Sequence, residues 1–235
     1  MSTPVIKINQ MEPEAVEIPT EEVLRYLGCR AGTLQKEESV DSLKKLVSGG
    51  IALLKPSLSY KACYLQSPVS FSENGIVRIG GLELKSRGLF CRLEGCREAV
   101  LFAATIGVQA ERLMQREAKL HPAMGMILDA VGSAAVEAYC DRLEEVLRRT
   151  AEPAGWYLRE RYSPGYGDLS LAVQNEFLQI LDAFRKIGIG LTDRRMMVPS
   201  KSVTAIIGLS RTKEIETKKT GCAGCGNVGC AYRKE

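Results

Sequence analysis

The sequence of 235 residues lacks several features that mark common classes of protein. No apolar run reaches the roughly 18–20 residues that a membrane span needs. The first residues show no apolar core of a signal peptide and carry several acids. There is also no G-x-x-x-x-G-K-[ST] loop to cradle a triphosphate, which argues against an ATP-driven activity. We therefore expect a cytoplasmic protein with no membrane partner.

The chain also lacks a large excess of charge of either sign. The 32 basic residues exceed the 28 acidic ones by only four, and the two kinds are interspersed along most of the chain. No basic stripe with interleaved aromatic residues occurs, so nucleic acid is not an expected partner. The one local basic excess, in RTKEIETKK, is interpreted as a solvated linker.

The composition is that of a soluble globular protein, with 45% hydrophobic and 26% charged residues. Residues 60–85 contain short β-leaning segments divided by glycine and proline. The run REAVLFAATIG is continuous, apolar and typical of a buried strand. Because strands and long helices occur without regular βαβ alternation, the sequence predicts an α+β fold.

The helical segments are predicted from their periodicity and their breakers. Thr20 is expected to cap a short helix that stops near Gly28. A second helix is expected over SVDSLKKLVSGGIALLKP. Two helices are expected in residues 108–150, with a break near HPAMG, and one more in residues 170–187. The predicted organisation is an N-terminal arm (1–19), one domain (20–210), and a charged linker with a cysteine tail (211–235).

The stretch RYSPGYGD, residues 161–168, is the clearest candidate site. Pro164 and Gly165 give a strong turn signal. Arg161 has a planar fork that can clamp a carboxylate, and Tyr166 offers a flat face to a ring or a cation. The alternative is purely structural: a capped turn with a surface salt bridge, in which Ser170 or Asp168 caps the following helix.

A resemblance to a known family adds to this interpretation. RYSPGYGD, the following helix and LTDRRMMVPSKSVTAIIGL resemble the activation domain of vitamin B12-dependent methionine synthase, and more closely its stand-alone relatives. LEGCREAVLFAATIG also matches the pattern that the family shows before its long helices. The resemblance covers roughly residues 20–210. The combination of R-x-x-P-G-Y with a downstream M-x-P-x-x-S is fairly specific.

The resemblance implies a mainly antiparallel twisted sheet with several long helices, which binds S-adenosylmethionine. It also implies reactivation of cob(II)alamin by reductive methylation, as part of a methionine synthase or other corrinoid methyltransferase system. The implied binding residues are Arg161, Ser163, Pro164, Gly165, Tyr166, Met197, Pro199 and Ser202. Asp168 and Glu160 are candidates for the acid that would face the ligand's ammonium group.

Cobalamin is expected to come on a partner. The chain lacks D-x-H-x-x-G, the motif that presents a histidine to cobalt, and its one histidine, His121, is interpreted as a helix-boundary residue. The expected partner is a methionine synthase without its own activation domain, or another corrinoid methyltransferase. The reaction also needs an electron donor such as flavodoxin or ferredoxin.

The C-terminal GCAGCGNVGC places Cys222, Cys225 and Cys230 in a C-x2-C-x4-C pattern. Because cytoplasmic thiols stay reduced, these residues are candidate metal ligands rather than disulfide partners. An iron–sulfur cluster that supplies the low-potential electron and a zinc site are both possible. A fourth ligand could come from another cysteine or be absent; the other cysteines are Cys29, Cys63, Cys91, Cys96 and Cys140.

Three functional hypotheses follow from the sequence. The first is a reactivation protein that uses S-adenosylmethionine to methylate a partner's corrinoid. The second is a non-catalytic module that only docks on the corrinoid protein. The third is an iron–sulfur electron-transfer accessory protein built around the cysteine tail.

Overall fold

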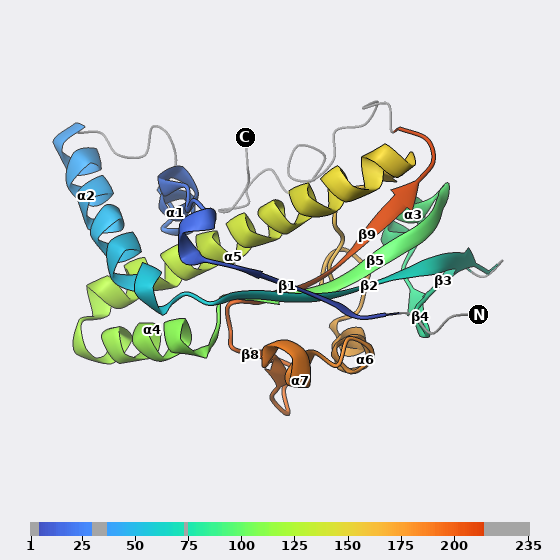
Figure 1. Ribbon diagram of the computed structural model, residues 1–235. Helices are drawn as coiled ribbons and strands as arrows, with labels where there is room; N and C mark the ends of the chain where they lie inside the picture. Colours follow the sequence, from blue (N-terminus) through green and yellow to red (C-terminus); the bar gives the residue numbers. More distant parts are fainter. Residues whose placement is uncertain (1–4, 30–36, 73–74, 214–235) are drawn as a thin grey trace.

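The computed structural model describes residues 5–29, 37–72 and 75–213, and it confirms the predicted α+β class. A twisted antiparallel sheet lies at the centre, with helices on both of its faces (Figure 1). Its three long strands are β2 (Tyr60–Phe71), β5 (Cys96–Thr105) and β9 (Ser202–Ser210). In their register Leu65 lies opposite Leu101, and Leu101 lies opposite Ile206.

Shorter strands extend this sheet at both edges. The strand order is β4-β3-β2-β5-β9-β6, and β1 pairs with the first half of β2. Residues Met197–Val198 and Gly190–Leu191 form a separate small hairpin, β7–β8. The bounds of the edge strands are β1 Lys7–Met11, β3 Ile76–Ile79, β4 Leu82–Lys85 and β6 Tyr157–Leu158. The short 3₁₀ segments are η1 Pro13–Ala15, η2 Lys55–Ser57, η3 Glu152–Ala154 and η4 Leu171–Val173.

The continuous apolar run of β5 at residues 99–104 is explained by burial on both faces. Successive side chains of a strand point to opposite sides of a sheet. Val100 and Phe102 accordingly belong to one hydrophobic core, and Leu101 and Ala103 belong to the other. The sheet therefore separates two cores, and neighbouring residues of one strand pack into different cores.

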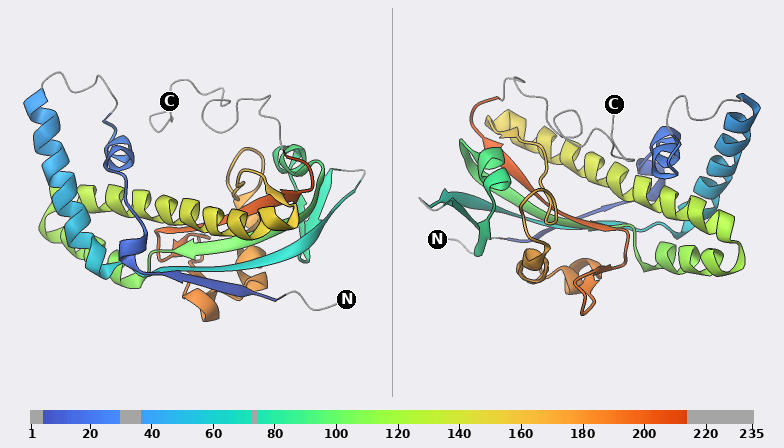
Figure 2. Two further views of the ribbon diagram at one scale, coloured as in Figure 1. Left: turned by 45° about the horizontal axis from the view of Figure 1, so that its top comes forward. Right: turned by 180° about the vertical axis from the view of Figure 1, so that it is seen from behind.

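Four helices form the layer on one face of the sheet: the longest runs diagonally across the sheet, and two of the others pack against the first half of that helix, beyond the end of the sheet (Figures 1 and 2). These helices are α1 (Thr20–Tyr26), α2 (Glu37–Leu54), α4 (Val108–Leu120) and α5 (Pro122–Ala151). The helical segment Pro122–Ala154 is long and apolar enough to cross a membrane by length and composition alone. Its most apolar window is 61% buried inside the protein, as expected for a core helix.

The opposite face carries the short helices α3 (Arg87–Leu93), α6 (Gln174–Ile180) and α7 (Ala183–Ile187). The prediction of one continuous helix over residues 170–187 is wrong. The chain breaks at Asp182, which has a positive φ of 48°. This break redirects the chain, so that Phe177 on α6 and Ile187 on α7 both pack into the core on this face.

The segment predicted as an N-terminal arm is partly built into the fold. Lys7–Met11 is extended, as expected, but it pairs with β2 instead of standing apart. Val16 and Ile18 are buried in the core beneath α5. The predicted break between two helices is confirmed, since α4 ends at Leu120 and α5 begins at Pro122. His121 lies between them, with Nδ1 2.8 Å from Glu117 Oε2.

The close packing of α4 against α5 predicts a specific intolerance at Gly125. A Cβ at this position would lie 2.5 Å from Ala118 Cα and 2.9 Å from Ala118 N. We expect Gly125→Ala to lower the free energy of unfolding by about 1–3 kcal/mol, because the two helices must move apart. Urea unfolding measures the change. The matched control is Gly49→Ala on α2, where the new Cβ has no neighbour within 4 Å. It should raise stability by about 0.5–1 kcal/mol. An equal gain at both sites would contradict this account of the packing.

Candidate functional site

Arg161 reaches the α5 face of the sheet because of its position on the extended segment that follows β6. After β6 the chain continues beside β9, and the N–H groups of Tyr162 and Ile206 each donate to the carbonyl oxygen of the other at 2.9 Å. Tyr162 packs against the core under α3, α6 and α7. Side chains alternate along an extended chain, and Arg161 accordingly points to the opposite face, toward α5.

Three carboxylates of α5 receive the Arg161 guanidinium. Nη2 donates to Glu137 Oε2 at 2.6 Å, and Nη1 donates to Asp141 Oδ1 at 2.6 Å. Nη1 also donates to Glu144. The three acids are spaced by four and three residues, which places them on one side of the helix. We call Glu137, Asp141 and Glu144 the acidic stripe.

The charges of this cluster do not balance. Three carboxylates face one guanidinium, so the cluster carries more negative than positive charge. The Arg161 side chain is only 22% exposed and that of Glu144 only 14%. Burial by itself would lower the pKa of Arg161, but the charges of Glu144 and Glu137 raise it, so the guanidinium stays charged. Burial raises the pKa of Glu144, and the attraction of Arg161 opposes that rise.

Arg161 also retains unused donors. A guanidinium has five N–H groups, and the bonds to the acidic stripe account for three of them. The Nε–H and one N–H on Nη2 have no hydrogen-bond partner within the described residues. The residue is thus both anchored and able to bind another acceptor.

A second cation lies on the same side of α5. Lys201 Nζ is 2.8 Å from Asp129 Oδ1 and 2.9 Å from Ser133 Oγ. Asp129, Ser133 and Glu137 are each four residues apart, so the polar line on α5 continues into the acidic stripe. From Asp129 to Glu144 this line is about 22 Å long at 1.5 Å per residue.

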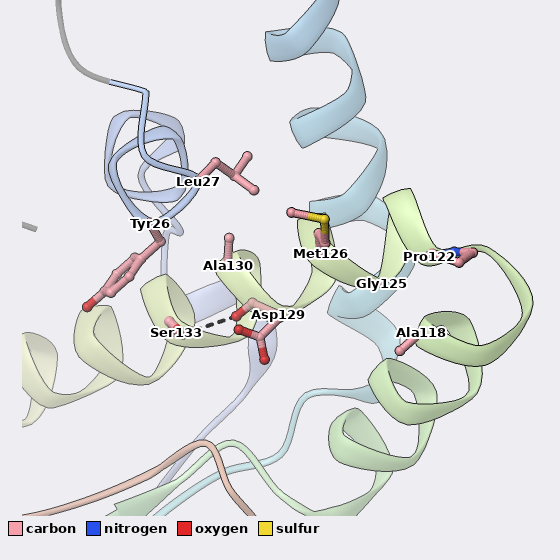
Figure 3. Close-up of a pocket in the computed structure, with 9 residues that line it drawn as sticks. All are labelled: Tyr26, Leu27, Ala118, Pro122, Gly125, Met126, Asp129, Ala130 and Ser133. Carbon is pink, nitrogen blue, oxygen red and sulfur yellow. Dashed lines mark hydrogen bonds between the residues drawn. The ribbon is translucent and has the colours of Figure 1, made fainter. Parts of the chain in front are cut away.

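A groove opens beside the first half of this line, between α1, α4 and α5 (Figure 3). It has a volume of about 800 Å³. Leu27, Met126 and Ala130 give it apolar walls, whereas Asp129 and Ser133 give it a polar side. Tyr26 of α1 also lines it, and the charge of Glu137 helps to raise the pKa of Tyr26, after the larger effect of burial. The groove and the acidic stripe are therefore neighbours.

The predicted corner is a tight turn whose residues differ in exposure. Gly165 N–H donates to Leu169 O at 2.8 Å, and Tyr166 N–H donates to Ser163 O at 3.1 Å. Pro164 is buried, whereas Tyr166 is 69% exposed and presents its ring to solvent. Gly167 has a positive φ of 53°, and a Cβ there would lie 2.6 Å from the Tyr162 hydroxyl.

Asp168 ties this corner to α3 rather than to the helix that follows it. Its carboxylate accepts from Ser86 Oγ at 2.5 Å, Arg87 N–H at 2.6 Å and Gly88 N–H at 3.1 Å. The role predicted for Ser170 is confirmed, since its hydroxyl accepts from Ala172 N–H. Glu160, the other candidate acid, pairs with Arg92 at 2.8 Å. Both proposed acids therefore have structural partners.

The second predicted motif lies mainly on the other side of β9. Met197 packs against the core under α6, and its Sδ accepts from Gln174 Nε2 at 3.1 Å. Ser202 Oγ lies 2.9 Å from Thr105 Oγ1 and 2.7 Å from the carbonyl oxygen of Pro199. Pro199 itself is buried. The structure does not bring Met197 together with Arg161. The residue of this motif that reaches α5 is Lys201.

The sequence interpretation missed the polar line on α5. A signal for it was present, because polar residues recur at four-residue intervals on a helix that is otherwise apolar. Their partners, Arg161 and Lys201, come from distant segments, and only the folded chain shows which cations meet which acids.

The cysteines of the described region do not form a metal site. Among residues 5–29, 37–72 and 75–213, no three His, Cys, Asp or Glu side chains are grouped to hold a metal ion. Burial raises the pKa of Cys63 to about 12 and that of Cys140 well above its usual value, which disfavours the thiolate that metals bind. Cys222, Cys225 and Cys230 lie outside the described residues, so their metal remains a prediction.

The contacts of Asp168 predict a specific pH dependence. Hydrogen bonds from Ser86 and the Arg87 amide lower its pKa below the usual 3.8. The hydrogen bonds to the Asp168 carboxylate stabilise the folded protein fully when the pH is above the usual pKa of an aspartate. This stabilisation is lost as the pH falls through the lower pKa of Asp168 in the folded state. We expect Asp168→Asn to lower stability at neutral pH and to remove this part of the acid dependence. Unfolding curves between neutral and strongly acidic pH measure both effects, with Asp193→Asn as an exposed control. Equal acid dependence in wild type and Asp168→Asn would contradict the capping role.

Comparisons with known proteins bear on the fold. No family model matches the sequence, and no curated protein matches it. A solved structure described as "Crystal Structure of the MetH Reactivation Domain bound to AdoHcy" is similar with a TM-score of 0.65. The similarity covers 90% of this chain and 80% of that chain, at 13% sequence identity. The predicted fold is therefore confirmed: this chain has the fold of the MetH reactivation domain.

Proposed function

We propose that this protein reactivates a corrinoid methyltransferase by reductive methylation, with S-adenosylmethionine as the methyl donor. One observation carries the proposal. Arg161 is anchored on the acidic stripe with two N–H groups unused, in a fold whose solved example holds AdoHcy, the demethylated form of that donor.

The charges of the site suit the amino-acid end of S-adenosylmethionine. The unused N–H groups of Arg161 would donate to its carboxylate, since an ionised acceptor forms the stronger hydrogen bonds with a guanidinium. The excess negative charge of Glu137, Asp141 and Glu144 would attract its ammonium and sulfonium groups. The acidic stripe thus replaces Asp168 and Glu160 as the source of the acid. Tyr166 adds an exposed ring at the turn, which can face a cation or a planar group.

The reaction does not require a nucleophilic side chain. One electron reduces cob(II)alamin held by the partner, the methyl–sulfur bond breaks, and the products are methylcobalamin and S-adenosylhomocysteine. Cobalt supplies the nucleophile, so this chain would contribute position and orientation. Its task is to hold the sulfonium so that the methyl group stays accessible from the partner's side.

The proposal requires two partners that carry what this chain lacks. The first is a methionine synthase without its own activation domain, or another corrinoid methyltransferase, which supplies cobalamin. The second is an electron donor such as flavodoxin or ferredoxin. An iron–sulfur cluster on Cys222, Cys225 and Cys230 would give the electron a path within this chain.

Binding of S-adenosylmethionine tests the proposal directly. We expect calorimetric titration of anaerobically purified protein to show binding, and Arg161→Ala to weaken it about 10- to 100-fold, because a charge-assisted pair is lost. The control is Arg185→Ala, which removes an exposed arginine of α7 on the opposite face of the sheet. No binding by the wild type would contradict the proposal and favour a module that only docks on the corrinoid protein.

The cysteine tail has a separate test. After anaerobic reconstitution with iron and sulfide, the wild type should show broad absorbance at about 400 nm, as iron–sulfur proteins do. Replacement of Cys222, Cys225 and Cys230 by serine should abolish it, whereas Cys91→Ser, at an exposed cysteine, should not. A colourless wild type would exclude the cluster and favour zinc or no metal.

A further inference from the structure

We infer that α7 and the β7–β8 hairpin form a surface that binds an anionic lipid bilayer peripherally. We call this surface the basic–apolar patch. Its members are the apolar Phe184, Met196 and Val198 and the basic Arg185, Lys186, Arg194 and Arg195. The patch lies on the face of the sheet opposite α5, so the inference goes beyond the proposed function and does not depend on it (Figures 1 and 2).

The apolar side chains of the patch project from one side of the hairpin. Gly190 and Val198 are directly opposite each other in the pairing of β7 with β8, and opposite residues of a strand pair point to the same side. A Cβ at Gly190 would lie 3.6 Å from Phe184 Cδ2, which places the Phe184 ring on that side, next to Val198. Met197 packs into the core, so Met196 before it is directed outward, as Val198 is.

These apolar side chains are unusually exposed. Phe184 is 73% exposed, Met196 61% and Val198 43%. Their neighbours Ala183 and Ile187 on α7 are buried in the core, so the helix is anchored while the Phe184 ring faces solvent. Neighbouring exposed apolar side chains with a polar rim mark surfaces that bind proteins or membranes.

The charge of the patch favours a negatively charged surface. Its four basic side chains are all exposed. Two acids oppose them: Asp182, whose Oδ2 lies 3.7 Å from Arg185 Nε, and Asp193 in the turn of the hairpin. Four cations and two acids leave a net charge of +2. Near an anionic bilayer each lysine or arginine strengthens binding about fivefold.

The small size of the patch favours a bilayer over a protein partner. A stable protein interface buries about 800 Å² on each side and needs a surface of matching shape. The patch offers three apolar side chains at the outer limit of the molecule, which is a small part of such an area (Figures 1 and 2). The boundary of a bilayer takes up aromatic and apolar side chains singly, while arginine and lysine remain among the headgroups.

Binding through this patch leaves the other face of the protein free. The acidic stripe on α5 would point away from the bilayer, where anionic headgroups do not repel it. The expectation of no membrane partner rested on the absence of a membrane-spanning segment, and peripheral binding needs no such segment. The protein can therefore contact a bilayer and a partner at the same time.

Flotation with lipid vesicles tests the inference. We expect the wild type to float with vesicles of phosphatidylglycerol and phosphatidylcholine in equal parts, and not with vesicles of phosphatidylcholine alone. Phe184→Ala should weaken binding to the anionic vesicles about 5- to 20-fold, because an apolar ring is lost. The double variant Lys186→Gln/Arg194→Gln should weaken it about 10- to 30-fold, and added salt should also weaken it.

The matched controls lie on α2, on the other side of the sheet. Leu46→Ala removes an exposed apolar side chain, and Lys44→Gln removes an exposed positive charge. Both variants should bind the anionic vesicles as the wild type does. Far-ultraviolet circular dichroism of each variant checks that the fold is retained.

Each possible result decides the question. No binding of the wild type to anionic vesicles, or equal binding to both kinds of vesicle, would overturn the inference and favour a protein partner for the patch. Binding that either Phe184→Ala or the double variant leaves unchanged would also overturn it, because the inference requires both the apolar and the basic side chains. Titration with S-adenosylmethionine tests the proposed function separately, so neither result decides the other.

Discussion

The charged contacts between the sheet edge and α5 depend on the pairing of cations with carboxylates, beside the apolar core that the two share. Arg161 comes from the edge strand and Lys201 from the segment before β9, and both reach over to the same side of the helix. Without them, α5 would place four like charges along one line, with Glu144 largely removed from water. An uncompensated buried charge costs several kcal/mol. The ion pairs therefore compensate acids of α5 that would otherwise stand unpaired, and the excess of acids keeps the site negative.

The two faces of the sheet have different tasks. On one face α3, α6 and α7 hold the corner at residues 161–168: Tyr162 packs into their core, and Asp168 bonds to the first turn of α3. On the other face α5 presents the charged groups. Because side chains alternate along the edge strand, Tyr162 fixes the chain below the sheet while Arg161 serves the site above it. A rigid attachment on one side thus orders a polar site on the other.

Much of this fold could be predicted from local patterns. The apolar run of β5, the cap at Ser170 and the helix break beside His121 are set by nearby residues, and the structure has them where the sequence indicated. The break at Asp182 could not be predicted, because it follows from the packing of Phe177 and Ile187 against the sheet. The pairing of Lys7–Met11 with β2 is likewise a contact between distant segments.

The site shows the same division. Arg161 stood out in the sequence because it adjoins the Pro164-Gly165 turn. Its partners on α5 are about twenty residues away, in a helix whose mostly apolar sequence predicts a core helix. Asp168 and Glu160 were chosen for their nearness in sequence, and the structure gives both of them other partners. Met197 shares a motif with Lys201, yet only Lys201 faces α5. The register of a strand decides to which face of the sheet each side chain points, and a sequence motif does not contain that information.

A crystal structure of the protein with S-adenosylhomocysteine would test the central claim most directly. The account predicts ligand density beside α5, with the carboxylate of the ligand at Arg161. Density on the opposite face of the sheet, beside Met197 and Gln174, would contradict it.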